Sequence, residues 1–573
     1  MKITYRLIKA SFPSIISNYS FSQSSVERYL KFSVINMNLL IRLLLIPFFC
    51  LIFESAFSMN ETIETQKNDK YTTLCYLWNT LRFVNSDVND WDSLLIKGID
   101  NNESPEALIS TFCDKIDKGQ IDQEINLKNN FSKFSWIEKD INLSTSQKQK
   151  IYYTLNHHLF YNSTLIFRDS KDVIRIKEEN LNLKLENINC QILTLFRVYG
   201  IIYYVSPYYS DSVNWDANLE TFLDSILKSK LSSTDFTIML SEFLSNLHEG
   251  HTLVFSKDKF AITGKKYLLP FNLIESNNNY IIQSSDSKEN LFKIGDTLLS
   301  INGIPVIEIA RVLFNMCPGF SDYTRELTVN RLLNKTSNEI NKLTFVKNKL
   351  PIELIVKGEE YNRKKDNKIK PKSNFYINDT ILYINPSVCK KNKSKHLLSF
   401  KQTSNLSCIV IDLREYPIPD TDIADIYYER LGKVRMRDEY WKSIDLDNLG
   451  KDYFSLKTNK ISKKTDQPRF QGKVFILVDG KTLSYGEILT LLIKDYANAT
   501  IIGNHTNGAI GAMAFIVLPD GSTFSLTLER FATANKLYFD EVPLDIVLEL
   551  DPLEYLNSND AFLDKAITLI LQK

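Results

Sequence analysis

Short apolar segments alternate with helical stretches from residue 375 to the C-terminus, and this alternation strongly limits the possible folds. We expect strands at residues 381–384, 408–413, 474–478, 500–503 and 514–518. Pro519-Asp520-Gly521 predicts a hairpin turn into a further strand over residues 522–530. Because buried strands that alternate with helices form layered sheets, the sequence predicts a layered α/β domain over residues 375–573.

The first 58 residues have the anatomy of a secretory signal peptide. Arg42 precedes an apolar run over residues 43–53, and small residues follow at Ala56 and Ser58. The run is shorter than the roughly 20 residues of a membrane-spanning helix. The sequence therefore predicts an exported protein, periplasmic or extracellular, with no membrane span in the mature chain. An N-terminal membrane anchor is the alternative, and Met37 is an alternative start.

The rest of the chain divides by composition. We expect a helical or mixed N-terminal domain over 59–189, a helical segment of the catalytic unit over 190–255, a β-rich module over 256–360 and a linker over 361–374. Within the module, a strand, an Asn302-Gly303 turn and a helix follow one another. The linker is rich in lysine and is expected to be solvated.

Charge and cysteine spacing exclude several classes of protein. The chain has 69 Lys and Arg against 68 Asp and Glu, a net charge of +1, so no overall basic field attracts nucleic acid. Seven cysteines lie far apart without a C-x-x-C pair, which argues against a zinc ribbon or a thioredoxin-type site. We therefore predict no nucleic-acid partner; the motifs described below imply no metal and no organic cofactor.

Ser484 is the strongest candidate for chemistry. The strand over 474–478 ends in the turn Asp479-Gly480-Lys481, and a helix begins near Ser484. Free N–H groups at a helix N-terminus favour developing negative charge. Position alone leaves two interpretations open, a nucleophile or an ordinary N-cap. A nucleophilic serine also needs a base, and spacing leaves His248, His251 and His505 as candidates.

Seven segments, in order over residues 190–570, carry a family resemblance. They include a helix end at 247–252, G-D-x-L-L-x-I-N-G at 295–303, D-L-R at 412–414, T-x-S-x-x-E at 482–487, a glycine-rich turn at 502–511, L-P-D-G at 518–521 and L-D-I at 544–546. Together they resemble the serine peptidases that include tail-specific (C-terminal processing) protease, the tricorn core and the interphotoreceptor retinoid-binding protein. The resemblance implies a layered α/β (ClpP/crotonase-like) peptidase core, a PDZ-like module and an N-terminal helical domain.

The resemblance also implies catalytic roles. Ser484 holds the position of the nucleophile, whereas Ala509 stands where the tail-specific branch has its lysine. The chain thus resembles an exported bacterial branch that lacks this lysine, and Lys481 is a poor substitute. His251 matches the base of the tricorn-like branch. Neutral imidazole, with a pKa of about 6.5, suits that role.

The remaining parts of the expected site depart from the family pattern. Glu249 replaces the aspartate of the common motif, and Gly250 replaces the serine beside the histidine. The expected acid of the triad is Asp540 or Glu541, although Tyr538 aligns at that position. The backbone N–H of Tyr485 is the expected first oxyanion donor. A second would come from Tyr416 or a neighbour, in a turn where Pro417 and Pro419 have no N–H.

Two functions follow from these residues. The first is an exported serine endopeptidase that cleaves peptides or proteins through an acyl-enzyme intermediate, without a cofactor. The alternative is a catalytically weak or inactive peptidase-like protein that binds a peptide or a hydrophobic ligand. The absent lysine and the proline-containing turn favour the alternative, and the ordered set of motifs favours the peptidase.

Overall fold

The computed structural model describes residues 70–84, 88–116, 132–157, 164–210, 212–256, 267–285, 291–347, 349–360, 375–388, 406–417, 421–432, 436–447, 451–460, 469–533, 535–550, 554 and 560–572. All of them lie in the unit Lys70–Lys573. The expected signal peptide (1–58) and linker (361–374) lie outside the described residues. None of the helices that the structure describes combines the length and apolar character needed to cross a bilayer.

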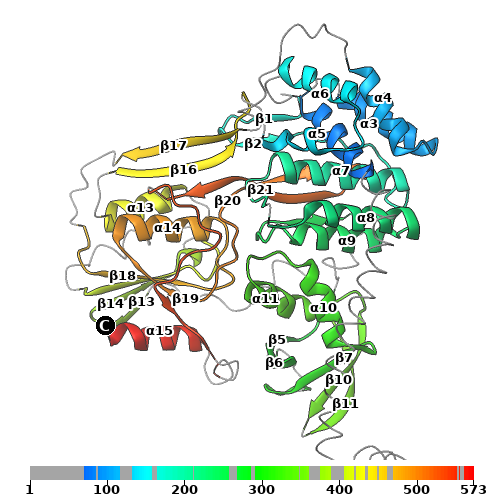
Figure 1. Cartoon of the computed structure of the whole chain (residues 1–573). Coiled ribbons are helices and arrows are strands. Elements are labelled where there is room, and N and C mark those ends of the chain that lie inside the picture. The colour runs from blue at the N-terminus through cyan, green and yellow to red at the C-terminus, as the bar shows by residue number, and fades with distance from the viewer. Residues whose placement is uncertain are drawn as a thin grey trace, which may run out of the picture. The chain divides into compact units, whose positions relative to one another are not determined.

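A six-stranded sheet forms the centre of the C-terminal domain (Figure 1). Its order is β13 (Phe375–Asn378), β14 (Ile381–Ile384), β15 (Cys408–Asp412), β18 (Lys473–Val478), β19 (Thr500–Gly503) and β22 (Ile546–Val547). All neighbours pair in parallel except β13, which is antiparallel to β14. The central strands are continuous apolar runs because both faces of a parallel sheet are covered.

Helices cover both faces of this sheet. On one face, Leu382 and Ile384 belong to a buried cluster with α13 (Thr421–Leu431) and α14 (Tyr485–Ala497). On the other, Ile381 and Tyr383 share a cluster with α15 (Ala561–Leu571). Neighbouring residues of one strand point to opposite faces, so β14 contributes to both clusters. The three layers confirm the predicted layered α/β fold.

A second sheet lies beside the histidine segment. Its order is β17 (Asp452–Lys460), β16 (Met436–Ile444), β21 (Thr523–Ala532) and β20 (Gly511–Val517), and β3 (Leu253–Phe255) also pairs with β21. The hairpin β16–β17 is not among the predicted strands. β20 and β21 match the predicted hairpin. Because β3 begins two residues after His251, its pairing with β21 ties the histidine to this sheet.

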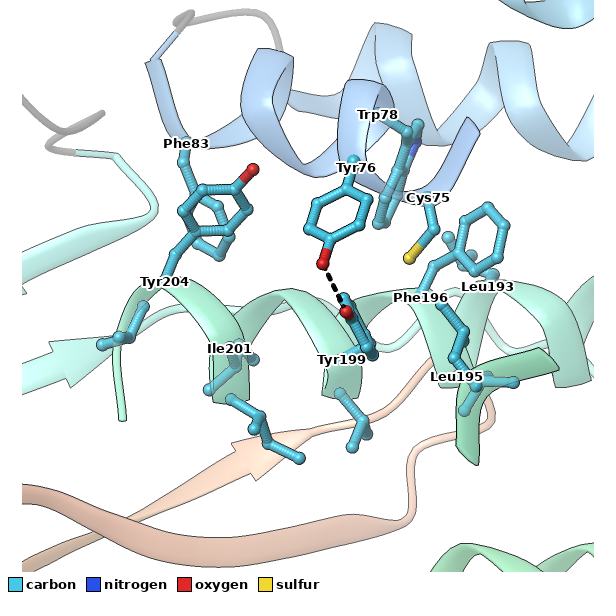
Figure 2. Packing of buried hydrophobic residues seen from close by; sticks show 14 of the residues in the cluster. Cys75, Tyr76, Trp78, Phe83, Leu193, Leu195, Phe196, Tyr199, Ile201 and Tyr204 are labelled. Carbon is cyan, nitrogen blue, oxygen red and sulfur yellow. Dashed lines mark hydrogen bonds between the residues drawn. The ribbon is translucent and has the colours of Figure 1, made fainter. Parts of the chain in front are cut away.

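The N-terminal region is mainly helical and packs on the second sheet. It contains helical residues 70–84, α3 (Val88–Asp100), α4 (Pro105–Lys115), η2 (Ser132–Phe134), α5 (Trp136–Lys139), α6 (Thr145–His157), the hairpin β1 (Ile166–Arg168) and β2 (Ile174–Ile176), α7 (Ile188–Tyr204), α8 (Trp215–Ser229) and α9 (Ser233–Ser245). Figure 2 shows Tyr76 and Tyr199 in this core, where their hydroxyls lie 2.7 Å apart. Asp216 accepts hydrogen bonds from both, which satisfies the buried hydroxyls.

The β-rich region has a core of its own. Its larger sheet runs β11 (Leu350–Lys357), β10 (Ile340–Lys347), β7 (Thr297–Ile301), β6 (Asn279–Ser285) and β5 (Phe271–Ser276), with β8 (Ile304–Pro305) beside β7. A smaller sheet joins β12 (Glu359–Glu360), β4 (Tyr267–Leu268) and β9 (Lys335–Thr336), and the helices are α10 (Val306–Met316) and α11 (Asp322–Leu333). η3 (Pro386–Val388) follows β14 in the C-terminal domain. The predicted turn is present, with Asn302 at φ 53°.

Candidate active site

Ser484 lies between the end of β18 and the start of α14, in a strained backbone conformation. Its φ is 54° and its ψ is −117°, a combination that residues with a Cβ rarely adopt. Thr482 holds the preceding turn, since its hydroxyl donates to Leu413 O over 3.0 Å and accepts from Asp479 N over 3.0 Å. The surrounding structure thus fixes the half-buried serine at the N-terminus of α14, with the backbone N–H groups of the first helical turn beside it.

Glu487 connects this serine to a second loop. Its fully buried carboxylate accepts from the backbone N–H of Ser484 at 2.9 Å. It also accepts from Thr506 Oγ1 at 2.7 Å and from the N–H groups of Gly508 and Ala509 at 2.8 Å each. Burial raises the pKa of Glu487 to about 7, although these four hydrogen bonds favour the ionised form. The carboxylate therefore joins the N-terminus of α14 to the turn over 506–509.

The same turn contacts the segment before His251. Gly250 N donates to Gly508 O over 3.0 Å, and Asn507 N donates to Thr482 O over 3.0 Å. A Cβ placed on Gly250 would lie 1.8 Å from Asn507 Oδ1. The side chain of Asn507 thus fills the space that the family's serine would need, which explains the glycine at this position.

His251 is buried, and only one of its ring nitrogens has a partner. Its Nδ1 lies 2.9 Å from Thr527 Oγ1, whereas its Nε2 has no hydrogen-bond partner among the described residues. Burial lowers the pKa of His251, and the nearby Glu249 carboxylate opposes this shift. The imidazole is therefore neutral at pH 7, as a proton acceptor must be.

The two acids expected to orient His251 have other partners. Asp540 accepts from Arg530 Nη2, and Glu541 lies 2.9 Å from His505 Nδ1. The Nδ1 of His251, which was expected to contact one of these acids, contacts Thr527 on β21 instead. Neither acid orients the imidazole in this structure. Sequence alone could not assign this contact, because it joins segments that lie far apart in the chain.

The turn that carries Tyr416, one of the expected oxyanion donors, contacts the start of α14. A Cβ placed on Gly486 would lie 3.4 Å from Pro417 Cδ, so the turn that carries Tyr416 packs on the first turn of α14. Burial raises the pKa of the Tyr416 phenol, against hydrogen bonds from the Ser484 side chain and the Tyr485 backbone that lower it. Tyr416 therefore reaches the serine with its side chain, whereas the sequence suggested its backbone N–H.

Lys481 is not arranged as a base. Its ammonium lies 3.5 Å from Glu415, and its side chain is 49% exposed. The charge of Asp479 raises the pKa of Lys481. A lysine base needs the opposite shift, toward neutral pH. Ala509, at the usual lysine position, is fully buried and contributes only its backbone to the site.

Comparison with known families identifies the class of this domain. Residues 381–548 match peptidase family S41. This domain thus matches a family of serine peptidases, as the resemblance of its motifs predicted. The matched range includes Ser484 and Glu487 but not His251, which lies far earlier in the chain.

Solved structures show a distant likeness, and no curated protein matches the chain. Mature CPAF complexed with lactacystin has 13% identity and a TM-score of 0.49, covering 68% of this chain and 99% of that one. The photosystem II D1 C-terminal processing protease has 16% identity and a TM-score of 0.34, with 66% and 99% covered. The tricorn protease has 13% identity and a TM-score of 0.33, with 70% and 38% covered.

Proposed function

We propose that the protein is an exported serine endopeptidase in which Ser484 is the nucleophile and His251 the general base. One observation supports this pairing most strongly. The carboxylate of Glu487 binds both Ser484 N and the turn over 506–509, and that turn accepts the N–H of Gly250, next to His251. Two segments more than 200 residues apart are thereby held to one loop.

The proposed reaction uses groups that the site already contains. The proton of Ser484 Oγ passes to His251 Nε2 while Oγ bonds to the scissile carbonyl carbon, and Tyr485 N–H faces the oxyanion. The imidazolium then returns its proton to the leaving amine as the C–N bond breaks. Water, activated by the same imidazole, hydrolyses the acyl-enzyme.

Peptides or proteins are the substrate class expected of the family. Export is supported by the sequence of residues 1–58 alone. Removing these residues should leave the protein inside the cell, which fractionation of the native host measures. Equal export of the full and shortened chains would refute this part of the proposal.

One feature favours the alternative of a peptidase-like binding protein. The phenol of Tyr416 lies near enough to the Tyr485 N–H and the Ser484 side chain for both to lower its pKa. A carbonyl that is to be attacked needs this N–H, so the phenol would compete with substrate for it. In a binding protein no such competition would arise.

A fluorophosphonate probe separates the two functions, because it labels only an activated serine. We expect the full chain to be labelled, and Ser484→Ala to lose both labelling and cleavage of fluorescein-labelled casein. The matched control is Ser232→Ala, which removes another helix N-cap serine, one that accepts from Asp235 N. Wild-type protein that resists the probe, or labelling that survives Ser484→Ala, would refute the proposed nucleophile.

A further inference from the structure

Glu249 is a buried acid directly beside the proposed base. Its Oε2 accepts from His251 N at 2.7 Å, and its Oε1 accepts from Thr252 Oγ1 at 2.9 Å. On the opposite strand, Thr527 donates to it twice, through its backbone N–H at 3.0 Å and its hydroxyl at 3.2 Å. Two donors reach each oxygen, so the acceptor sites of this carboxylate are filled.

Strand pairing places Thr527 beside the imidazole. β3 and β21 are antiparallel, with Leu253 opposite Ser525. Continuing this register by two residues sets His251 opposite Thr527, at the distance where cross-strand side chains touch. Ser525 Oγ also donates to His251 O, which fixes the histidine backbone at the end of the strand. The contact between imidazole and hydroxyl is thus a consequence of the sheet.

The direction of the hydrogen bonds determines the tautomer of His251. Thr527 has a single hydroxyl proton, and Glu249 Oε2 accepts it. The 2.9 Å contact between Thr527 Oγ1 and His251 Nδ1 must then be donated by Nδ1–H. A neutral imidazole protonated on Nδ1 carries its lone pair on Nε2. That nitrogen is the one left without a partner in the described structure.

We propose that Glu249 and Thr527 are positioning residues that hold His251 as a proton acceptor through its Nε2. They would supply the orientation that the family resemblance assigns to an acid near residue 540. When Ser484 Oγ–H transfers its proton to Nε2, the Nδ1–H bond to Thr527 persists and the negative charge of Glu249, 3.8 Å from Nδ1, stabilises the imidazolium. This inference depends on the proposed function in one respect only, namely that Ser484 is the source of the proton that Nε2 accepts.

The first test reads the tautomer directly and needs no activity. In the full chain labelled with ¹⁵N-histidine, the signal of His251 is assigned by its loss in His251→Gln, which is practical because the chain has six histidines. At pH 7 we expect a proton on Nδ1 and none on Nε2. Thr527→Val should reduce this preference, and Thr527→Ser should keep it. A proton on Nε2 in the wild-type protein would overturn the inference, whether or not the protein is a peptidase.

The second test follows catalysis. Thr527→Val should lower kcat on fluorescein-labelled casein about a hundredfold with KM within about threefold, since loss of a tautomer-fixing acid costs up to about 10⁴-fold. Thr527→Ser should restore the rate to within about tenfold of wild type. Thr523→Val, on the same strand, is the matched control. Loss of activity with Glu541→Gln, combined with a wild-type rate for Thr527→Val, would overturn the inference and return the role to the expected acid.

The outcomes separate the two proposals. If Ser484→Ala keeps its activity while His251 shows the expected tautomer, the proposed nucleophile fails and the positioning of His251 stands. If Ser484→Ala is inactive while Thr527→Val retains the wild-type rate and tautomer, the peptidase stands and the positioning role fails. Circular dichroism shows whether Thr527→Val folds. If it does not fold, the tautomer of His251 in the wild-type protein alone tests the positioning role.

Discussion

The buried carboxyl of Glu487 should make the stability of the protein depend on pH in a specific direction. Its pKa rises from an ordinary 4.5 to about 7 because burial penalises the charge. Between these two values the folded protein keeps a proton that the unfolded chain has lost. The contribution of Glu487 to stability is therefore full below about pH 4.5 and declines as the pH rises through about 7.

The size of the effect follows from the same two values. They differ by about 2.5 pH units, and each unit corresponds to about 1.4 kcal/mol, so the decline is roughly 3 kcal/mol. Glu487→Gln does not titrate. The free energy of unfolding of the wild type minus that of the variant should therefore fall by roughly 3 kcal/mol between pH 4 and pH 8.

Urea unfolding at several pH values measures this difference. Both proteins should carry Ser484→Ala, so that self-cleavage does not distort the curves. The matched control is Glu353→Gln on β11, where the carboxylate is 61% exposed. A difference for Glu487→Gln that rises with pH would refute the reasoning, because the four hydrogen bonds would then outweigh burial. A difference independent of pH would refute it as well.

Three further predictions test neighbouring contacts. Tyr416→Phe removes the phenol that competes for an oxyanion donor, a hydrogen bond of about 1 kcal/mol net, so fluorophosphonate labelling should accelerate about fivefold; slower labelling would show that the phenol assists. Gly250→Ser should slow labelling at least about tenfold because Asn507 fills the space, and Asn507→Ala should recover part of the rate; an unaffected Gly250→Ser would contradict the packing. Arg197→Met removes a buried ion-pair partner of Asp92, so the free energy of unfolding measured in urea should fall by about 3–5 kcal/mol. A loss under about 1 kcal/mol would contradict the importance of this ion pair.

The strands of the parallel sheet could be predicted because burial on both faces leaves long apolar runs in the sequence. Residues 381–384 and 500–503 are strands with the predicted bounds, and α14 begins at the residue after Ser484. The hairpin β16–β17 left no comparable signal. Its first strand, MRDEYWKSI, mixes charged and aromatic residues, since a strand with a partly exposed face needs no apolar run.

The site was predictable only where its residues share a local motif. Ser484 could be found because a strand, a turn and a helix follow one another within 25 residues. Thr527 could not, since its contact with His251 spans 276 residues and depends on the pairing of β3 with β21. One available signal was Glu249, an acid two residues before the histidine, but sequence reasoning treated it only as a departure from the motif.

The departures from the family motifs lie in one connected network. Ala509 replaces the lysine, yet its backbone N–H binds Glu487, a contact that any residue except proline can make. Gly250 replaces the serine and leaves room for Asn507, whose backbone binds Thr482 in the turn before Ser484. Orientation of the histidine then passes to the neighbouring Glu249 through Thr527, on the opposite side of the imidazole from the unpartnered Nε2. Each of the two loops thus holds a buried carboxylate that accepts four hydrogen bonds, which compensate for the unfavourable burial of its charge.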